Sequence, residues 1–162
     1  MDIIAEQIVE SGANENKFLY KILIIGFTIA ISILALIFLM PLGILIIVGI
    51  VFLSMHLIKG MDIEYEYLVV NGEIDVDKII SKKKRVRLLT VKVSSFESFG
   101  KFSTADDIDM ETTTFIVSDG IYENEYYADF NHSEYGRSRI IFSPNKKVIE
   151  SIKPYLSRRI VL

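Results

Sequence analysis

The chain has 162 residues, enough for one domain with an appendage, and a formal net charge of −3. Its hydrophobic content of 51% excludes intrinsic disorder, and the uncharged stretch 22–58 excludes a purely soluble enzyme. The absence of cysteine excludes disulfides, thiolate nucleophiles and Cys-ligated metals, and two histidines make His-based catalysis improbable. We therefore expect a protein that is not an enzyme and that has no cofactor, metal site or catalytic residue.

The first segment, residues 1–16, is predicted to be a short amphipathic element followed by a loop. Ile4, Ala5, Ile8 and Val9 share one face of a helix, so residues 1–10 are expected to form one or two helical turns. Such a segment would either lie on lipid headgroups or dock on the soluble part of the chain.

Residues 17–60 are predicted to form a transmembrane hairpin of two helices, at about 18–40 and 42–59. The break is placed at Pro41 and Gly43, because proline removes a backbone donor and suits the first turn of a new helix. A signal peptide is disfavoured, since the residues before the apolar stretch are acidic. The alternative is a re-entrant hairpin that enters and leaves one leaflet.

Basic residues flank the hairpin and are missing from its turn. Lys17 and Lys21 precede the first helix and Lys59 follows the second. The positive-inside rule therefore predicts a multi-pass protein of the cell membrane with both termini in the cytoplasm.

Small and polar residues predict how the helices pack. Thr28, Ser32 and Ala35 share a face of the first helix, and Gly49 and His56 share a face of the second. In an antiparallel hairpin Ala35 would face Gly49 and Thr28 would lie level with His56. His56 is either a proton or ligand site or, as we favour, a neutral histidine that bonds to Thr28 or reaches toward water.

From residue 61 the hydrophobic period changes to two, which predicts a domain of antiparallel strands over 61–162. Asn71-Gly72 marks a tight hairpin that pairs Tyr67 with Val76 and Val69 with Ile74. A third strand, a helical turn and three more strands are expected at 85–93, 94–100, 112–118, 122–131 and 137–142. A last helix, 144–156, is capped by Ser143 and ended or kinked by Pro154. The predicted fold class is an α+β membrane protein: a helical hairpin, then an antiparallel curved sheet or half-barrel capped by a C-terminal helix.

Several segments carry a resemblance to a family: 6–9 (EQIV), 64–67 (EYEY), 71–73 (NGE), 75–80 (DVDKII), 84–89 (KRVRLL) and 142–144 (FSP). On these segments the chain resembles small bacterial two-helix membrane proteins with a pleckstrin-homology-like (PH-like) cytoplasmic domain. The resemblance implies the architecture, and it brings no established activity and no catalytic residues.

The sequence has no strong motif for metal, nucleotide or nucleic-acid binding. Asp106, Asp107, Asp109 and Glu111 lack the spacing of a calcium loop and indicate a solvated acidic loop. Phosphate-binding glycine motifs are missing, and residues 61–162 carry 15 basic and 17 acidic residues, which disfavours nucleic acid as a partner.

A basic turn is the candidate membrane-surface contact. The first strand leaves the membrane and the second returns to it, so the following turn is expected at the headgroups. Its basic residues are Lys82, Lys83, Lys84, Arg85 and Arg87. The alternative is a solvated turn that only reinforces the topology.

Together these features predict a non-catalytic, membrane-anchored binding or scaffold module. Its expected partners are the bilayer, anionic lipid headgroups, an unidentified protein and a second copy of the chain. The alternatives are a structural envelope component that oligomerises through its helices, or an accessory to a transporter or membrane enzyme.

Overall fold

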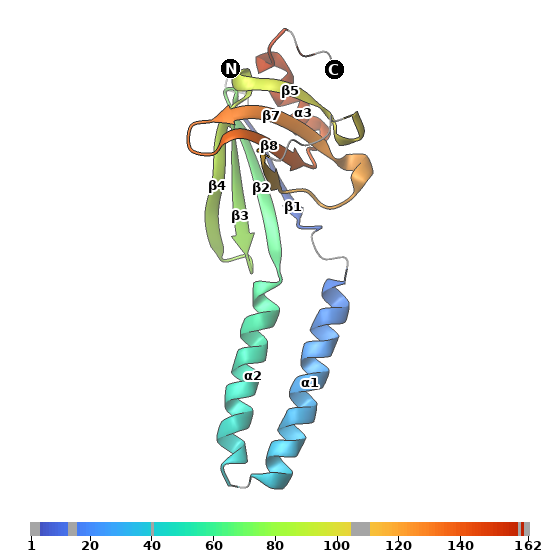
Figure 1. The fold of residues 1–162 in the computed structure, drawn as a ribbon, viewed down its shortest axis with the longest axis vertical. Helices are drawn as coiled ribbons and strands as arrows, with labels where there is room; N and C mark the ends of the chain where they lie inside the picture. The colour runs from blue at the N-terminus through green and yellow to red at the C-terminus, as the bar shows by residue number, and fades with distance from the viewer. Residues whose placement is uncertain (1–3, 13–15, 40, 105–110, 159, 161–162) are drawn as a thin grey trace.

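The computed structural model describes residues 4–12, 16–39, 41–104, 111–158 and 160. Two long helices, α1 (Lys17–Phe38) and α2 (Gly43–Gly60), extend side by side from one end of a β domain (Figure 1). This arrangement confirms the predicted order of two N-terminal apolar helices, then strands, then a C-terminal helix.

The first sheet has the order β1-β2-β3-β4 and is antiparallel throughout. Its strands are β1 (Ile4–Glu10), β2 (Ile63–Val70), β3 (Glu73–Ile80) and β4 (Lys84–Lys92). The register predicted for the Asn71-Gly72 hairpin is confirmed, with Tyr67 opposite Val76 and Val69 opposite Ile74. Asn71 and Gly72 have φ angles of 48° and 83°, as a tight hairpin turn requires.

The N-terminal segment is a strand, so the predicted amphipathic helix is wrong. The spacing of Ala5 and Val9 places them on one side of a helix and equally on one side of a strand. In the structure both are buried beside β2, and Gln7 between them lies on the same face. Pairing with the edge of β2 satisfies the backbone of this segment, which an isolated helix of two turns would not achieve as well.

The second sheet has the order β5-β7-β8-β6. Its strands are β5 (Phe96–Lys101), β6 (Thr113–Ile116), β7 (Tyr126–His132) and β8 (Gly136–Phe142). The pairing of β6 with β8 is parallel, so the expectation of an entirely antiparallel sheet is wrong at this edge. The antiparallel β7–β8 pair occupies the other side of β8, and β6 adds to its free side.

The helical turn predicted at 94–100 is also replaced by a strand. A short 3₁₀ turn, Val93–Ser95, leads directly into β5. Phe96 and Phe99 are three residues apart, which suits one face of a helix. In the strand, a register shift between Phe96 and Ser98 lets both rings point into the hydrophobic core.

The C-terminal helix α3 (Lys146–Ile152) is shorter than expected and packs against β1 and β2. Asn145, not Ser143, is its N-cap, because the Asn145 side chain accepts a hydrogen bond from the Val148 amide at 2.9 Å. A 3₁₀ turn at Lys153–Tyr155, which contains Pro154, ends it. Val148 and Ile152 enter a core shared with Tyr67 and Phe142, so both sheets and α3 close around one interior.

Candidate functional site

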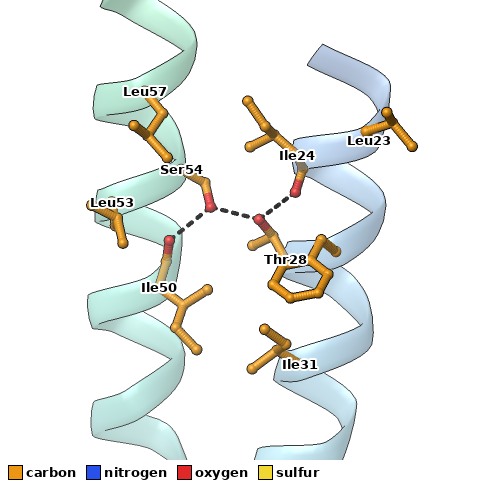
Figure 2. Close-up of a pocket in the computed structure, with 9 residues that line it drawn as sticks. Leu23, Ile24, Thr28, Ile31, Ile50, Leu53, Ser54 and Leu57 are labelled. Carbon is orange, nitrogen blue, oxygen red and sulfur yellow. Dashed lines mark hydrogen bonds between the residues drawn. The ribbon is translucent and has the colours of Figure 1, made fainter. Parts of the chain in front are cut away.

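The helix hairpin is held by a pair of hydroxyl groups. Thr28 Oγ1 and Ser54 Oγ lie 2.5 Å apart across the α1–α2 interface (Figure 2). Each hydroxyl also lies within hydrogen-bond distance of a carbonyl one turn earlier in its own helix, that of Ile24 at 2.7 Å and that of Ile50 at 2.8 Å. Polar pairs of this kind join helices where water does not compete.

The predicted packing face is corrected in two places. The hydrogen-bond partner of Thr28 across the interface is Ser54, whereas His56 is exposed. Ala35 is buried against Gly43 rather than Gly49, since a Cβ on Gly43 would lie 2.4 Å from the Ala35 carbonyl oxygen. Open space surrounds Gly49. In both contacts the residue of α1 meets an earlier residue of α2 than a turn centred at residue 42 predicts.

Ser32, the remaining member of the predicted face, bonds within its own helix. Its hydroxyl donates to the Thr28 carbonyl at 2.7 Å. This bond satisfies the hydroxyl without help from α2.

Almost all the apolar surface of the hairpin is exposed. By length and composition α1 and α2 are both capable of crossing a membrane. Among described residues each helix buries only one, Ala35 in α1 and Gly43 in α2. A cavity of about 480 Å³ beside Thr28 and Ser54 is otherwise lined by Leu, Ile and Phe side chains (Figure 2).

The basic turn lies directly against the end of α2. The Ser81 hydroxyl donates to the Lys59 carbonyl, and the Ser81 amide donates to the Asp62 carbonyl at 2.7 Å. Lys82, Lys83 and Lys84 follow and are exposed. The structure therefore places these lysines at the helix end of the β domain, as the strand lengths predict.

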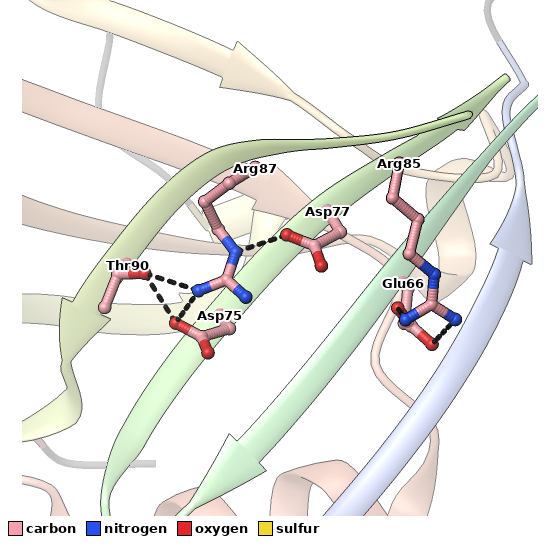
Figure 3. A network of polar contacts seen from close by, with 6 residues as sticks. All are labelled: Glu66, Asp75, Asp77, Arg85, Arg87 and Thr90. Atoms are coloured by element: carbon pink, nitrogen blue, oxygen red, sulfur yellow. Dashed lines mark hydrogen bonds and ion pairs between the residues drawn. The ribbon is translucent and has the colours of Figure 1, made fainter.

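Arg85 and Arg87 differ from these lysines because carboxylates on the outer face of the first sheet neutralise them (Figure 3). Arg85 makes two contacts with Glu66, at 2.8 and 2.9 Å. Arg87 contacts Asp75 at 2.8 Å and also binds Asp77. Their charge is therefore compensated within the sheet, and Lys82 is also 3.8 Å from Glu64, so Lys83 and Lys84 are the least compensated basic residues of the turn.

Glu66 is the buried member of this network, with 5% of its surface exposed. Burial raises the pKa of its carboxyl group, the charge of Arg85 opposes that rise, and Glu6 and Asp77 add to it. Arg85 thus opposes the effect of burial on the pKa of this carboxyl group without outweighing it.

A second polar cluster joins segments that carry the family resemblance. The Gln7 amide group donates to the Ser143 carbonyl at 2.9 Å and accepts from the Asn145 amide at 2.7 Å. Tyr67 donates to the Val117 carbonyl and accepts from the Ser143 amide, and the Ser143 hydroxyl donates to Asp119 at 2.7 Å.

Burial raises the pKa of Tyr67 above its usual value, so its hydroxyl stays a donor. These contacts fix β1, β2 and the end of β8 together.

The described residues offer little for catalysis. Within the described ranges, no group of three His, Asp or Glu side chains could hold a metal ion. Asp106, Asp107 and Asp109 lie outside the described residues, and Glu111 is exposed.

The comparison with protein families decides the identity of the fold. A family model described as "Bacterial PH-like domain (DUF6106)" matches residues 1–162. The chain belongs to this family. No curated protein and no solved structure matches it. The PH-like assignment covers the hairpin as well as the strands, so the helices are part of the family's architecture, and the fold is one typical of binding modules.

Proposed function

We propose that the protein is a membrane-anchored binding module whose hairpin crosses the cell membrane and whose PH-like domain lies in the cytoplasm. The observation that carries this proposal is the exposed apolar surface of α1 and α2. Phe18, Phe38, Leu45 and Phe52 each have more than 70% of their surface exposed. A continuous apolar surface of this extent requires a bilayer or another apolar partner.

The first experiment tests insertion. The full chain should stay in the membrane pellet after alkaline extraction and dissolve only in detergent. Each lysine at a helix centre costs about 2.5–3.5 kcal/mol of insertion free energy, so the double variant Ile29→Lys/Phe52→Lys should leave the pellet. Ile116→Lys, at an exposed position of β6, is the matched control and should remain in it. Extraction of the unaltered chain at high pH would refute the anchor.

The second experiment tests topology and uses the absence of cysteine from the chain. Leu42→Cys, at the turn between the helices, should react with an impermeant maleimide added to intact cells. Glu97→Cys, exposed on β5, should react only after lysis. Failure of Leu42→Cys to react until lysis would favour the re-entrant hairpin.

The three exposed lysines support a further part of the proposal, contact with anionic headgroups. Each basic residue near an anionic surface is worth about 1 kcal/mol. Full-length protein in nanodiscs should order the β domain more strongly on phosphatidylglycerol than on phosphatidylcholine, as measured by hydrogen exchange at 78–88. Lys83→Gln/Lys84→Gln should remove that difference, and an unchanged difference would assign the lysines to topology alone.

Crosslinking of the full-length protein in membranes tests for the unidentified protein partner. The outcome expected of a binding module is a protein that crosslinks to the β domain in membranes. Crosslinks confined to copies of α1 and α2 would instead favour the structural, oligomerising component.

A further inference from the structure

A cleft of about 420 Å³ lies between the first turns of α1 and the start of β2. Its apolar members are Phe18 and Ile63. Its charged members are Glu10, Lys17, Lys21, Asp62, Glu64 and Lys82. Because it sits where the hairpin joins the β domain, it lies at headgroup depth if the hairpin spans the bilayer.

The charges of this cleft are balanced, with three lysines and three carboxylates. An anionic ligand alone would meet the carboxylates, and a cationic ligand alone would meet the lysines. A small ligand that carries both signs a few atoms apart is complementary to both sets.

Some of these groups are already engaged and form the walls of the cleft. Lys21 Nζ lies 2.7 Å from Asp62 Oδ1, which joins α1 to the entry of β2. Lys17 Nζ donates to the Ser11 carbonyl at 2.7 Å, which joins α1 to the end of β1. The cleft therefore exists before a ligand arrives.

Other groups have capacity left. Lys82 Nζ is 3.8 Å from Glu64, and 79% of the Lys82 side chain is exposed. The Glu64 side chain is only 17% exposed, and within the described part of the chain Lys82 is the one cation that forms an ion pair with it. Glu10 is exposed and makes no side-chain hydrogen bond or ion pair within the described part of the chain.

We propose that this cleft binds the phosphoethanolamine headgroup of a zwitterionic phospholipid. The phosphate contacts Lys82, and the primary ammonium donates its N–H bonds to Glu10 and Glu64. Phe18, which is 76% exposed on the helix side, contacts the start of the acyl chains. The proposal rests on the proposed membrane anchor, and it names a lipid chemistry different from the anionic surface that Lys83 and Lys84 would meet.

The ammonium explains why this headgroup is preferred over choline. Phosphatidylcholine carries the same charges, but its trimethylated nitrogen has no hydrogen to donate to a carboxylate. A site that uses Glu10 and Glu64 as acceptors therefore discriminates between two lipids of equal net charge.

The test uses purified full-length protein in detergent, with lipids that share the same short acyl chains. Native mass spectrometry should show phosphatidylethanolamine retained more strongly than phosphatidylcholine or phosphatidylglycerol. Exposed charge pairs contribute up to about 1 kcal/mol, so Lys82→Gln and Glu10→Gln should each weaken phosphatidylethanolamine binding about fivefold. Lys92→Gln and Glu97→Gln, on exposed positions of the β domain, are the matched controls and should change nothing.

The sign of the Glu10→Gln effect decides the outcome. A cleft for anionic lipid would bind phosphatidylglycerol more tightly after Glu10→Gln, because a repelling charge is lost, and that result would overturn the proposal. If soluble glycerophosphoethanolamine at equal concentration displaced phosphatidylethanolamine, the proposal that the ligand is a lipid would be overturned, and a soluble ligand with the same headgroup would replace it. The alkaline extraction assay is run on the same variants, so failure of the membrane anchor is seen separately from failure of the cleft.

Discussion

Tyr67 links the two sheets through one hydroxyl group. The residue is fully buried on β2, and its hydroxyl serves both the Val117 carbonyl and the Ser143 amide. Tyr67→Phe leaves both backbone groups buried without a partner, which costs about 1–3 kcal/mol of unfolding free energy. Urea unfolding followed by near-UV circular dichroism measures this cost. Tyr122→Phe, at a position 58% exposed, should lie within about 0.5 kcal/mol of the unaltered chain.

The carboxylate of Asp129 makes the stability of the β domain depend on pH. Burial tends to raise its pKa, but hydrogen bonds from Arg139, at 2.8 Å, and Ser98, at 2.6 Å, outweigh burial and lower the pKa below its usual 3.8. A lowered pKa in the folded state gives stability that is present above pH 3.8 and is lost as the pH falls through the folded-state value.

Asp129→Asn should therefore cost about 1–3 kcal/mol at pH 7 and less at pH 3. The measurement is the urea midpoint at both pH values, with Glu97→Gln as the control on the neighbouring strand. An equal cost at the two pH values would show that the charge of Asp129 contributes nothing.

At the scale of elements, β1 is where neighbouring residues have opposite roles. Val9 is 8% exposed in the core, whereas Ile8, one residue earlier, is 52% exposed on the outer face. Val9→Asp buries a charge and should lower the unfolding free energy by about 3 kcal/mol or more. Ile8→Asp should cost less than about 1 kcal/mol. A helix lying on headgroups would instead give the two substitutions similar costs, because Ile8 and Val9 share one face of such a helix.

The hairpin of α1 and α2 offers a second pair of matched positions. Gly43→Ala places a methyl group against the Ala35 carbonyl, and such overpacking costs about 1–3 kcal/mol. Gly49→Ala meets open space and should leave the helix contact unchanged. Thermal unfolding in detergent, followed by helical circular dichroism, compares the two. Equal melting temperatures would contradict the observed Ala35–Gly43 contact.

The elements that were predictable from sequence are those with a strong period and a local turn signal. The β2–β3 hairpin is correct to the residue, because Asn71-Gly72 sets the turn and the alternation sets the face. β1 was missed because its spacing of four fits both periods and its partner strand lies beyond both helices. β5 was missed because a register shift, which has no sequence signal here, allows Phe96 and Phe99 to point inward together.

The candidate site follows the same division. The position of the basic turn beside the end of α2 was predictable, because it follows from the equal lengths of β2 and β3 alone. The neutralisation of Arg85 and Arg87 depends on carboxylates from two other strands, so it required the sheet register. The cleft at Glu10 and Lys82 is lined by residues from β1, α1 and the β3–β4 turn. These segments are far apart in the chain, so no local sequence pattern predicts the cleft.

At the scale of the whole molecule, α1 and α2 are an insertion between two adjacent strands. β1 and β2 are antiparallel neighbours, and the Ser11 amide donates to the Ile63 carbonyl at 3.0 Å. Deletion of residues 13–61 joins Gly12 to Asp62 as a two-residue turn, for which glycine at the first position is suitable. The shortened chain should be soluble, monomeric and strand-rich, with a cooperative melt.

The control for this deletion is the fragment 62–162, which lacks β1. It exposes the core that Ala5 and Val9 cover and the open edge of β2, so it should aggregate or melt without cooperativity. A well-folded fragment 62–162 would show that β1 is dispensable. Aggregation of the shortened chain would show that the hairpin itself is needed to hold β1 against β2.

The position of β1 before the helices also orders events during synthesis. β1 leaves the ribosome before both helices, and residues 11–62 must follow before its neighbour β2 exists, while the strands that complete the core come later still. The Ala35–Gly43 contact joins the helices near their turn and the Thr28–Ser54 pair joins them at mid-length, so a formed helix pair shortens the effective loop between β1 and β2 and lowers the entropic cost of closing it. We therefore expect completion of the first sheet to depend on formation of the helix pair. A chain whose helices fail to assemble would keep β1 and the edge of β2 unpaired, and unpaired strand edges promote aggregation.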